Sequence, residues 1–169
     1  MKNIKFLLAM VGLVFAFSFN ASAQNVVFTS LDGEKIDLEA QKGKVVVMAI
    51  GASWLPLSKQ QTETINKLAR KYSGRDVVFY FIATDSAAEK SRNFASNDQI
   101  RQFAERSKLT VTILRDAEGA LTIKRYNVDQ LPAFVILDKE GRVAGEPFGG
   151  IDPKSDISVP ISQAIDKIL

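Results

Sequence analysis

Two uninterrupted apolar runs on either side of an amphipathic segment place the strongest limit on the fold. The runs are Val45 to Ile50 and Val77 to Ala83. Continuous runs of this kind are typical of strands buried on both faces of a sheet. Between them, residues 59–72 have apolar side chains at the i, i+3, i+4, i+7 spacing of a helix with one buried stripe. The order strand, helix, strand predicts a crossover unit with parallel strands, and therefore an α/β domain.

Shorter elements are expected on both sides of this unit. Asp32-Gly33 is a turn dipeptide between alternating apolar residues, which predicts a hairpin near the N-terminus. The polar stretch 85–96 has no periodicity and is expected to be a surface loop. Later in the chain we expect a helix around residues 100–104, a strand at 111–114, a helical segment at 116–126, a strand at 133–137 that turns back through 142–144 as an antiparallel hairpin, and a last helix at 161–168.

The first 23 residues have the features of a secretory signal peptide. Lys2 and Lys5 precede a largely apolar stretch at 6–19, and the small residues 21–23 form a cleavage site, with the cut expected between Ala23 and Gln24. An apolar stretch of 14 residues is shorter than the roughly 20 that cross a bilayer, so we expect no stable membrane insertion after cleavage. We predict a signal peptide at 1–23, one domain at 24–169, and a periplasmic or secreted location.

Neither cysteine nor histidine occurs in the 169 residues. Disulfides, thiol nucleophiles, thiolate metal sites and imidazole acid–base catalysis are therefore excluded, and we expect no cofactor and no metal site. The chain has 22 Lys and Arg residues against 19 Asp and Glu residues, and two of the lysines belong to the leader. The remaining chain is almost neutral and has no electrostatic footprint for nucleic acid, so we expect no nucleic-acid partner.

The segment between the first buried strand and the helix resembles a known active site. Residues 52–59, Ala-Ser-Trp-Leu-Pro-Leu-Ser-Lys, resemble the segment of the thioredoxin fold that carries a Trp-Cys-x-x-Cys motif. Residues 126–143 resemble the stretch with that fold's cis-proline and final hairpin, with Pro132 at the cis-proline position. The early hairpin makes the chain more similar to TlpA/ResA-like and AhpC/TSA-like secreted thiol–disulfide proteins than to thioredoxin itself. The resemblance implies a thioredoxin-like fold, a central mixed β-sheet flanked by helices with an N-terminal β-hairpin.

Both redox positions of that resemblance are substituted. Leu55 and Ser58 stand where the family has its two cysteines, and Ala49 stands where thioredoxin has a buried carboxylate. The family consists of thiol–disulfide oxidoreductases, but this chain has no thiol to ionise. We therefore predict no catalytic residues and no activity in thiol–disulfide exchange.

The rest of the motif predicts a binding groove for a protein or an extended peptide. The resemblance implies that its wall is formed by Trp54, Leu55, Pro56, Leu131 and Pro132. In the family, the residue before the cis-proline pairs its backbone with a substrate peptide. If these side chains instead pack inward, they only preserve the fold. A family-type or non-thiol oxidoreductase and a non-enzymatic structural subunit are the other functions that the sequence leaves open.

Two further features have an ordinary structural explanation. Ser58 is a hydroxyl next to Lys59, but no histidine can activate it, and a serine at a helix start commonly bonds to the backbone. A basic helix face is expected from Lys67, Arg70, Lys71 and Arg75, and such a face is usually a solvated surface.

Overall fold

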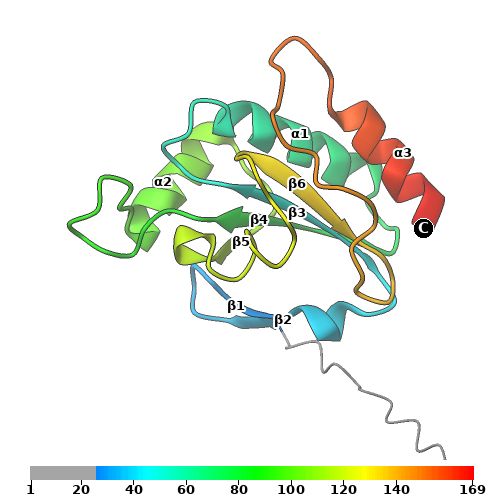
Figure 1. The fold of residues 1–169 in the computed structure, drawn as a ribbon, viewed down its shortest axis with the longest axis horizontal. Helices are drawn as coiled ribbons and strands as arrows, with labels where there is room; N and C mark the ends of the chain where they lie inside the picture. Colours follow the sequence, from blue (N-terminus) through cyan, green and yellow to red (C-terminus); the bar gives the residue numbers. More distant parts are fainter. Residues whose placement is uncertain (1–25) are drawn as a thin grey trace, which may run out of the picture.

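The structure is a computed structural model that describes residues 26–169, so the predicted signal peptide and its cleavage site lie outside the described residues. A six-stranded mixed sheet has the order β2-β1-β5-β4-β3-β6 (Figure 1). Its strands are β1 (Val27–Ser30), β2 (Lys35–Asp37), β3 (Val45–Gly51), β4 (Val77–Ala83), β5 (Thr112–Arg115) and β6 (Ala133–Leu137). The helices are α1 (Ser58–Lys71), α2 (Asn97–Ser107) and α3 (Ser158–Ile168), with short 3-10 helices η1 (Leu38–Gln41) and η2 (Ala117–Gly119).

The predicted crossover unit forms the centre of the sheet. β3 and β4 are parallel, in register from Val45↔Val77 to Gly51↔Ala83, with α1 between them in the chain. All seven residues of β3 are buried, as its apolar run predicts. β6 lies on the other side of β3 and is antiparallel to it. The end of β3 and the start of β6 therefore lie at the same edge of the sheet.

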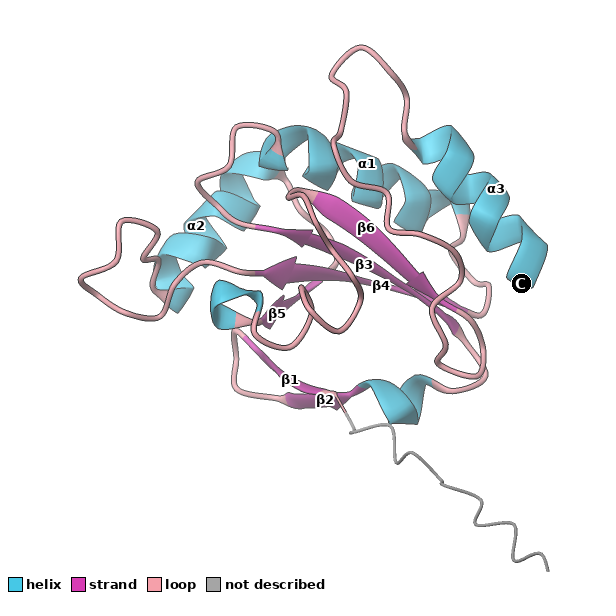
Figure 2. Cartoon of the chain, viewed as in Figure 1, coloured by secondary structure: helices cyan, strands magenta, loops and turns pink. Residues whose placement is uncertain are grey.

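Two apolar layers sandwich the sheet. α1, α2 and α3 cover one face (Figure 2), where Ile65, Ile100 and Ile161 pack against alternate residues of β3, β4 and β6. The intervening strand residues face the opposite layer, which contains Phe28 and Tyr126. The period-2 alternation of strand side chains thus divides one continuous apolar run between two cores. Within residues 26–169, no helix is both long and apolar enough to span a bilayer.

The expected mixed sheet and the early hairpin are confirmed, the hairpin because β1 pairs antiparallel with β2 across Asp32-Gly33. The helical segment expected at 116–126 is wrong over most of its length, since only Ala117–Gly119 is helical, in a 3-10 turn. Asp116 explains the difference: its carboxylate accepts the backbone N–H groups of Leu121 and Thr122, which stabilises a compact loop.

Two other expectations need correction. The returning strand of the C-terminal hairpin is reduced to isolated bridges, Leu137↔Val143 and Phe134↔Phe148. The stretch 85–96 is a loop, but it is not entirely on the surface, because Asp85 and Ser86 are buried at its start.

Candidate functional site

The segment that resembles an active site is the loop from β3 into α1. Two backbone hydrogen bonds shape it, from the Leu55 N–H to the Ala52 carbonyl (3.2 Å) and from the Ser58 N–H to the Leu55 carbonyl (3.1 Å). These tight turns bring the chain from the buried strand directly into the helix. The loop is therefore a defined surface at the edge of the sheet where β6 begins.

A buried carboxylate holds the first residue of this loop. Asp85 is fully buried and accepts the Ser53 backbone N–H at 3.0 and 3.1 Å and the Ser53 hydroxyl at 2.5 Å. Asp85 follows β4, whose end is joined to β3 by the bond from the Thr84 N–H to the Gly51 carbonyl. Sequence reasoning missed this contact, although an acidic residue two positions after a buried strand was a signal for it.

Ser58 is not available as a nucleophile. Its side chain is fully buried, and its hydroxyl donates to the Ala52 carbonyl at 2.6 Å. Lys59 is exposed, and its Nζ lies 3.9 Å from Oε1 of Glu63, one turn further along the surface of the helix. The ordinary explanation of Ser58, a serine bonded to the backbone at a helix start, fits this geometry.

Four apolar residues of the loop remain in contact with solvent. Trp54 is 50% exposed, Pro56 is exposed, and Leu55 and Leu57 are partly exposed. Leu57 packs against the core beneath the helices, whereas Leu55 belongs to neither of the apolar clusters formed by the described residues. The alternative in which Trp54 is packed fully inward does not fit this exposure.

The segment before β6 comes to the same edge of the sheet. Ala133 pairs with Ile50 near the end of β3, and Pro132 precedes it, buried and joined to Leu131 by a cis peptide bond. Leu131 is partly buried against the second core. Among the described residues, no hydrogen bond involves the backbone N–H or carbonyl of Leu131. A chain lying on this edge would therefore meet unpaired backbone groups.

Gln61 joins the two segments from beneath, and sequence reasoning missed it. Its Nε2 donates to the carbonyls of Ile50 (3.1 Å) and Ala133 (2.8 Å), and its side chain is fully buried. Its Oε1 has no hydrogen-bond partner, and a Cβ on Gly51 would lie 2.3 Å from that oxygen. A glutamine on the buried stripe of the helix, four residues before Ile65, was the available signal.

The carboxylates outside this site have structural contacts. The side chain of Asp138 accepts the backbone N–H groups of Glu140 and Arg142 and pairs with the Arg142 guanidinium. Desolvation raises the pKa of Asp138, but the contacts with Arg142 and Glu140 outweigh it and hold the pKa below its usual value. No group of three potential metal ligands occurs in the part of the chain that the structure describes.

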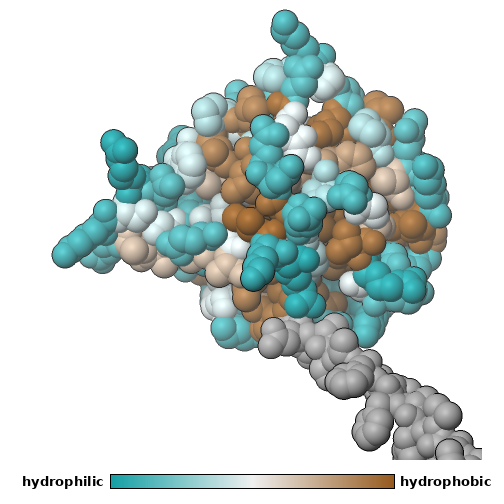
Figure 3. Space-filling view, in the orientation of Figure 1, coloured by the Kyte–Doolittle hydropathy of each residue, from teal (hydrophilic) through white to brown (hydrophobic). Residues whose placement is uncertain are grey.

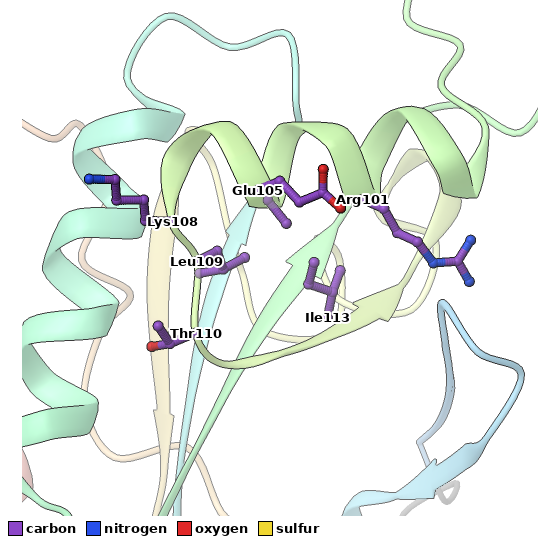
Figure 4. Close-up of a pocket in the computed structure, with 7 residues that line it drawn as sticks. Arg101, Glu105, Lys108, Leu109, Thr110 and Ile113 are labelled. Carbon is purple, nitrogen blue, oxygen red and sulfur yellow. The ribbon is translucent and has the colours of Figure 1, made fainter.

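Clear hollows lie away from the loop. One of about 370 Å³ lies between α2 and β5, where Leu109 and Ile113 form its floor and Arg101 its rim (Figure 4). A second, of about 470 Å³, lies between α1 and the end of α2. Both hollows lie along α2, and none of the five residues expected at the motif, Trp54, Leu55, Pro56, Leu131 and Pro132, lines either of them.

Residues 19–158 match the Redoxin family. The chain belongs to the redoxin family. This assignment agrees with the order of strands and helices and with the position of the Trp54 loop between β3 and α1.

Curated relatives place the chain among thioredoxin-like proteins. It is 34% identical over 125 residues to the thioredoxin-like protein YneN of Bacillus subtilis, a match that covers 74% of this chain and 68% of the relative. It is 28% identical over 127 residues to the thiol-disulfide oxidoreductase ResA of Bacillus thuringiensis, covering 75% and 68%. This redoxin therefore belongs to a thioredoxin-like thiol–disulfide oxidoreductase family, and its sequence contains no cysteine.

Solved structures confirm the fold. A secreted Mycobacterium tuberculosis disulfide oxidoreductase, homologous to DsbE of E. coli, superposes with a TM-score of 0.64 at 24% identity, covering 85% of this chain and 96% of that one. A thioredoxin-like protein from Aeropyrum pernix gives 0.68 at 20% identity, covering 85% and 89%.

Proposed function

We propose that this redoxin is an exported protein, inactive in thiol–disulfide exchange, that binds an extended polypeptide at the former active site. The binding surface consists of Trp54, Leu55, Pro56, Leu131 and Pro132, and is called the Trp54 surface below. Export rests on the features of residues 1–23 and accords with a structural relative described as secreted.

The exposure of Trp54 carries the proposal. A tryptophan with half its surface in water, beside partly exposed Leu55, leaves apolar area that a partner would bury. Tryptophan is also enriched among the residues that dominate binding energy in protein interfaces. On the face of the molecule seen in Figure 3, several apolar areas lie between hydrophilic side chains.

The backbone of Leu131 supports an extended ligand rather than a compact one. Its N–H and carbonyl make no hydrogen bond with the described residues, so an extended chain can pair with them as an added strand. Asp85 and Gln61 hydrogen-bond the Trp54 loop and the segment around Pro132, respectively. Because both segments are already held in place, less conformational entropy is lost when a ligand binds.

Loss of the redox chemistry follows from composition. Thiol–disulfide exchange begins with attack by a thiolate, and the chain has no cysteine. The matching positions are a leucine and a buried serine whose hydroxyl is bonded to the backbone. Purified protein is therefore expected to leave insulin disulfides unreduced.

Peptide binding is tested with the fluorescence of Trp54, the only tryptophan. The probe is a labelled, extended peptide with leucine and phenylalanine between glycine and serine. We expect Leu55→Asp to weaken its binding at least about tenfold, since a charge would be buried against apolar side chains. Val159→Asp is the matched control, because Val159 is 52% exposed on α3. Equal affinity of both variants would contradict the proposal.

A photo-crosslinking residue identifies the partner in cells. We expect a crosslinker at position 55 to capture defined envelope proteins, and one at position 159 to capture none of them. Capture at both positions would instead favour a structural subunit that docks through other faces.

A further inference from the structure

The cleft between α1 and the end of α2 is a second site, distinct from the Trp54 surface. It has a volume of about 470 Å³ and is lined by Lys59, Glu63, Asn66 and Arg70 from α1 and by Arg106 and Lys108 at the end of α2. It is called the α1–α2 cleft below. Four of these six side chains are cationic and one is anionic, so the cleft has an excess of positive charge.

The other basic residues of α1 differ from the cations of the cleft because they have acidic partners. Lys67 pairs with Asp156 at 2.6 Å, and Lys71 lies 3.4 Å from Asp166, so acidic groups near and on α3 offset both charges. Arg70 lies on the side of the helix that faces α2. The basic face expected from the sequence is therefore divided, and only part of it is compensated.

The remaining cations of the cleft lack a partner. Among residues 26–169, no salt bridge within 4.0 Å involves Arg70, Arg106 or Lys108. Lys59 lies 3.9 Å from Glu63, at the limit of an ion pair. Figure 4 shows the Lys108 side chain extending from the end of α2 toward α1, and Lys108 lines both this cleft and the neighbouring hollow. The cleft thus presents uncompensated donors to a ligand.

Asn66 fixes the shape of the cleft. Its side chain is buried, and its Nδ2 donates to the Lys108 carbonyl at 2.7 Å. Its Oδ1 accepts the Thr110 backbone N–H at 2.9 Å and the Thr110 hydroxyl at 2.8 Å. This clip joins the middle of α1 to the residues that follow α2, so the cations from the two helices are held across a fixed gap.

The arrangement of the α1 side chains indicates a linear ligand. Residues 59, 63, 66 and 70 fall within an arc of about 60° on the helix and extend about 16 Å along its axis, with the two cations, Lys59 and Arg70, at the ends of this row. An extended polypeptide covers that length with about five residues. A single phosphate would contact only a small part of the row, whereas nucleic acid needs a larger basic footprint than an almost neutral chain provides.

We propose that the α1–α2 cleft binds an acidic segment of a polypeptide, through carboxylate contacts with Arg70, Arg106 and Lys108. Arginine presents a planar fork of donors that matches a carboxylate with two parallel hydrogen bonds. Lys59 extends the row toward the first turn of α1.

The probe is a fluorescent peptide with a run of glutamates, and the same peptide with glutamines is its control. We expect the glutamate peptide to bind, and the double variant Arg70→Glu, Arg106→Glu to weaken it at least about tenfold. Arg92→Glu with Lys124→Glu makes the same change in net charge at exposed residues outside the cleft, and is expected to change binding by about twofold or less. Arg70→Gln with Arg106→Gln should give a smaller loss in the same direction.

Three results would overturn the proposal. The first is that the wild-type protein does not bind the glutamate peptide. The second is that the cleft and control double variants lose affinity for this peptide equally. The third is that tripolyphosphate or a single-stranded oligonucleotide binds more tightly than the glutamate peptide. The glutamate peptide carries no large apolar side chain, so its binding is independent of the Trp54 surface. Failure of either proposal therefore leaves the other standing.

Discussion

The side-chain Nε2 of Gln61 lies 2.8 Å from the backbone carbonyl oxygen of Ala133, and the same nitrogen also donates to the Ile50 carbonyl. One buried amide on α1 thus connects the end of β3 with the residue that follows Pro132. Through this contact, the helix that follows the Trp54 loop also positions the segment with the cis Leu131-Pro132 bond.

Replacing Gln61 with leucine is expected to destabilise the protein. The substitution keeps the approximate volume but leaves two buried carbonyls without this donor, which costs about 1–3 kcal/mol of unfolding free energy. Urea denaturation measures the change. Gln102→Leu, on the exposed surface of α2, is the control, with an expected change within about 0.5 kcal/mol. Similar stability of the two variants would show that the amide contacts contribute nothing.

Asp85 is predicted to order the Trp54 loop. Asp85→Ala removes the acceptor for the Ser53 N–H and hydroxyl, so we expect faster hydrogen exchange at Ser53 and an unfolding free energy lower by about 1–3 kcal/mol. Asp85→Asn retains one oxygen and should have a smaller effect. The exposed Asp76→Asn serves as the control. Unchanged exchange at Ser53 in Asp85→Ala would contradict this role.

The elements that could be predicted are those in which one local pattern determines the structure. The continuous apolar run of β3 and the helical spacing of α1 correspond to the observed strand and helix almost residue for residue. The segment after β5 could not be predicted in this way, because its conformation depends on the Asp116 carboxylate binding Leu121 and Thr122. A side chain that competes for backbone N–H groups overrides a weak helical propensity.

The candidate site was predictable only in part. The sequence placed Trp54 and Leu55 at the junction of a strand and a helix, where the structure has them. Asp85 lies 32 residues from Ser53, and Gln61 lies 72 residues from Ala133, so a local pattern could mark Asp85 and Gln61 as unusual polar residues but could not reveal their partners. The α1–α2 cleft has the same origin, since Arg70 and Arg106 are brought together only by helix packing.

Lys67 is predicted to control the titration of Asp156. The Lys67 ammonium and the Ser158 hydroxyl lower the pKa of Asp156 from its usual 3.8 to about 2. A carboxylate with a lowered pKa contributes stability above its usual pKa, and that contribution is lost as the pH falls from about 4 toward 2. We expect Lys67→Ala to raise the pKa of Asp156, measured by NMR titration of its carboxyl carbon, while Lys154→Ala leaves it unchanged. A pKa that stays at about 2 in Lys67→Ala would exclude the ion pair as the cause.

Single cysteine substitutions are predicted to distinguish position 55 from position 58. Leu55 is partly exposed and Ser58 is fully buried, so the thiol of Leu55→Cys should react with Ellman's reagent in the native protein. The thiol of Ser58→Cys should react slower by a factor on the order of a hundred, because the loop must open first. The Ser58 N–H lies 3.1 Å from the Leu55 carbonyl, and this tight turn favours an internal disulfide in the double variant on oxidation. Mass spectrometry detects that bond, and equal reactivity of the single variants would mean that the loop does not hold Ser58 inward in solution.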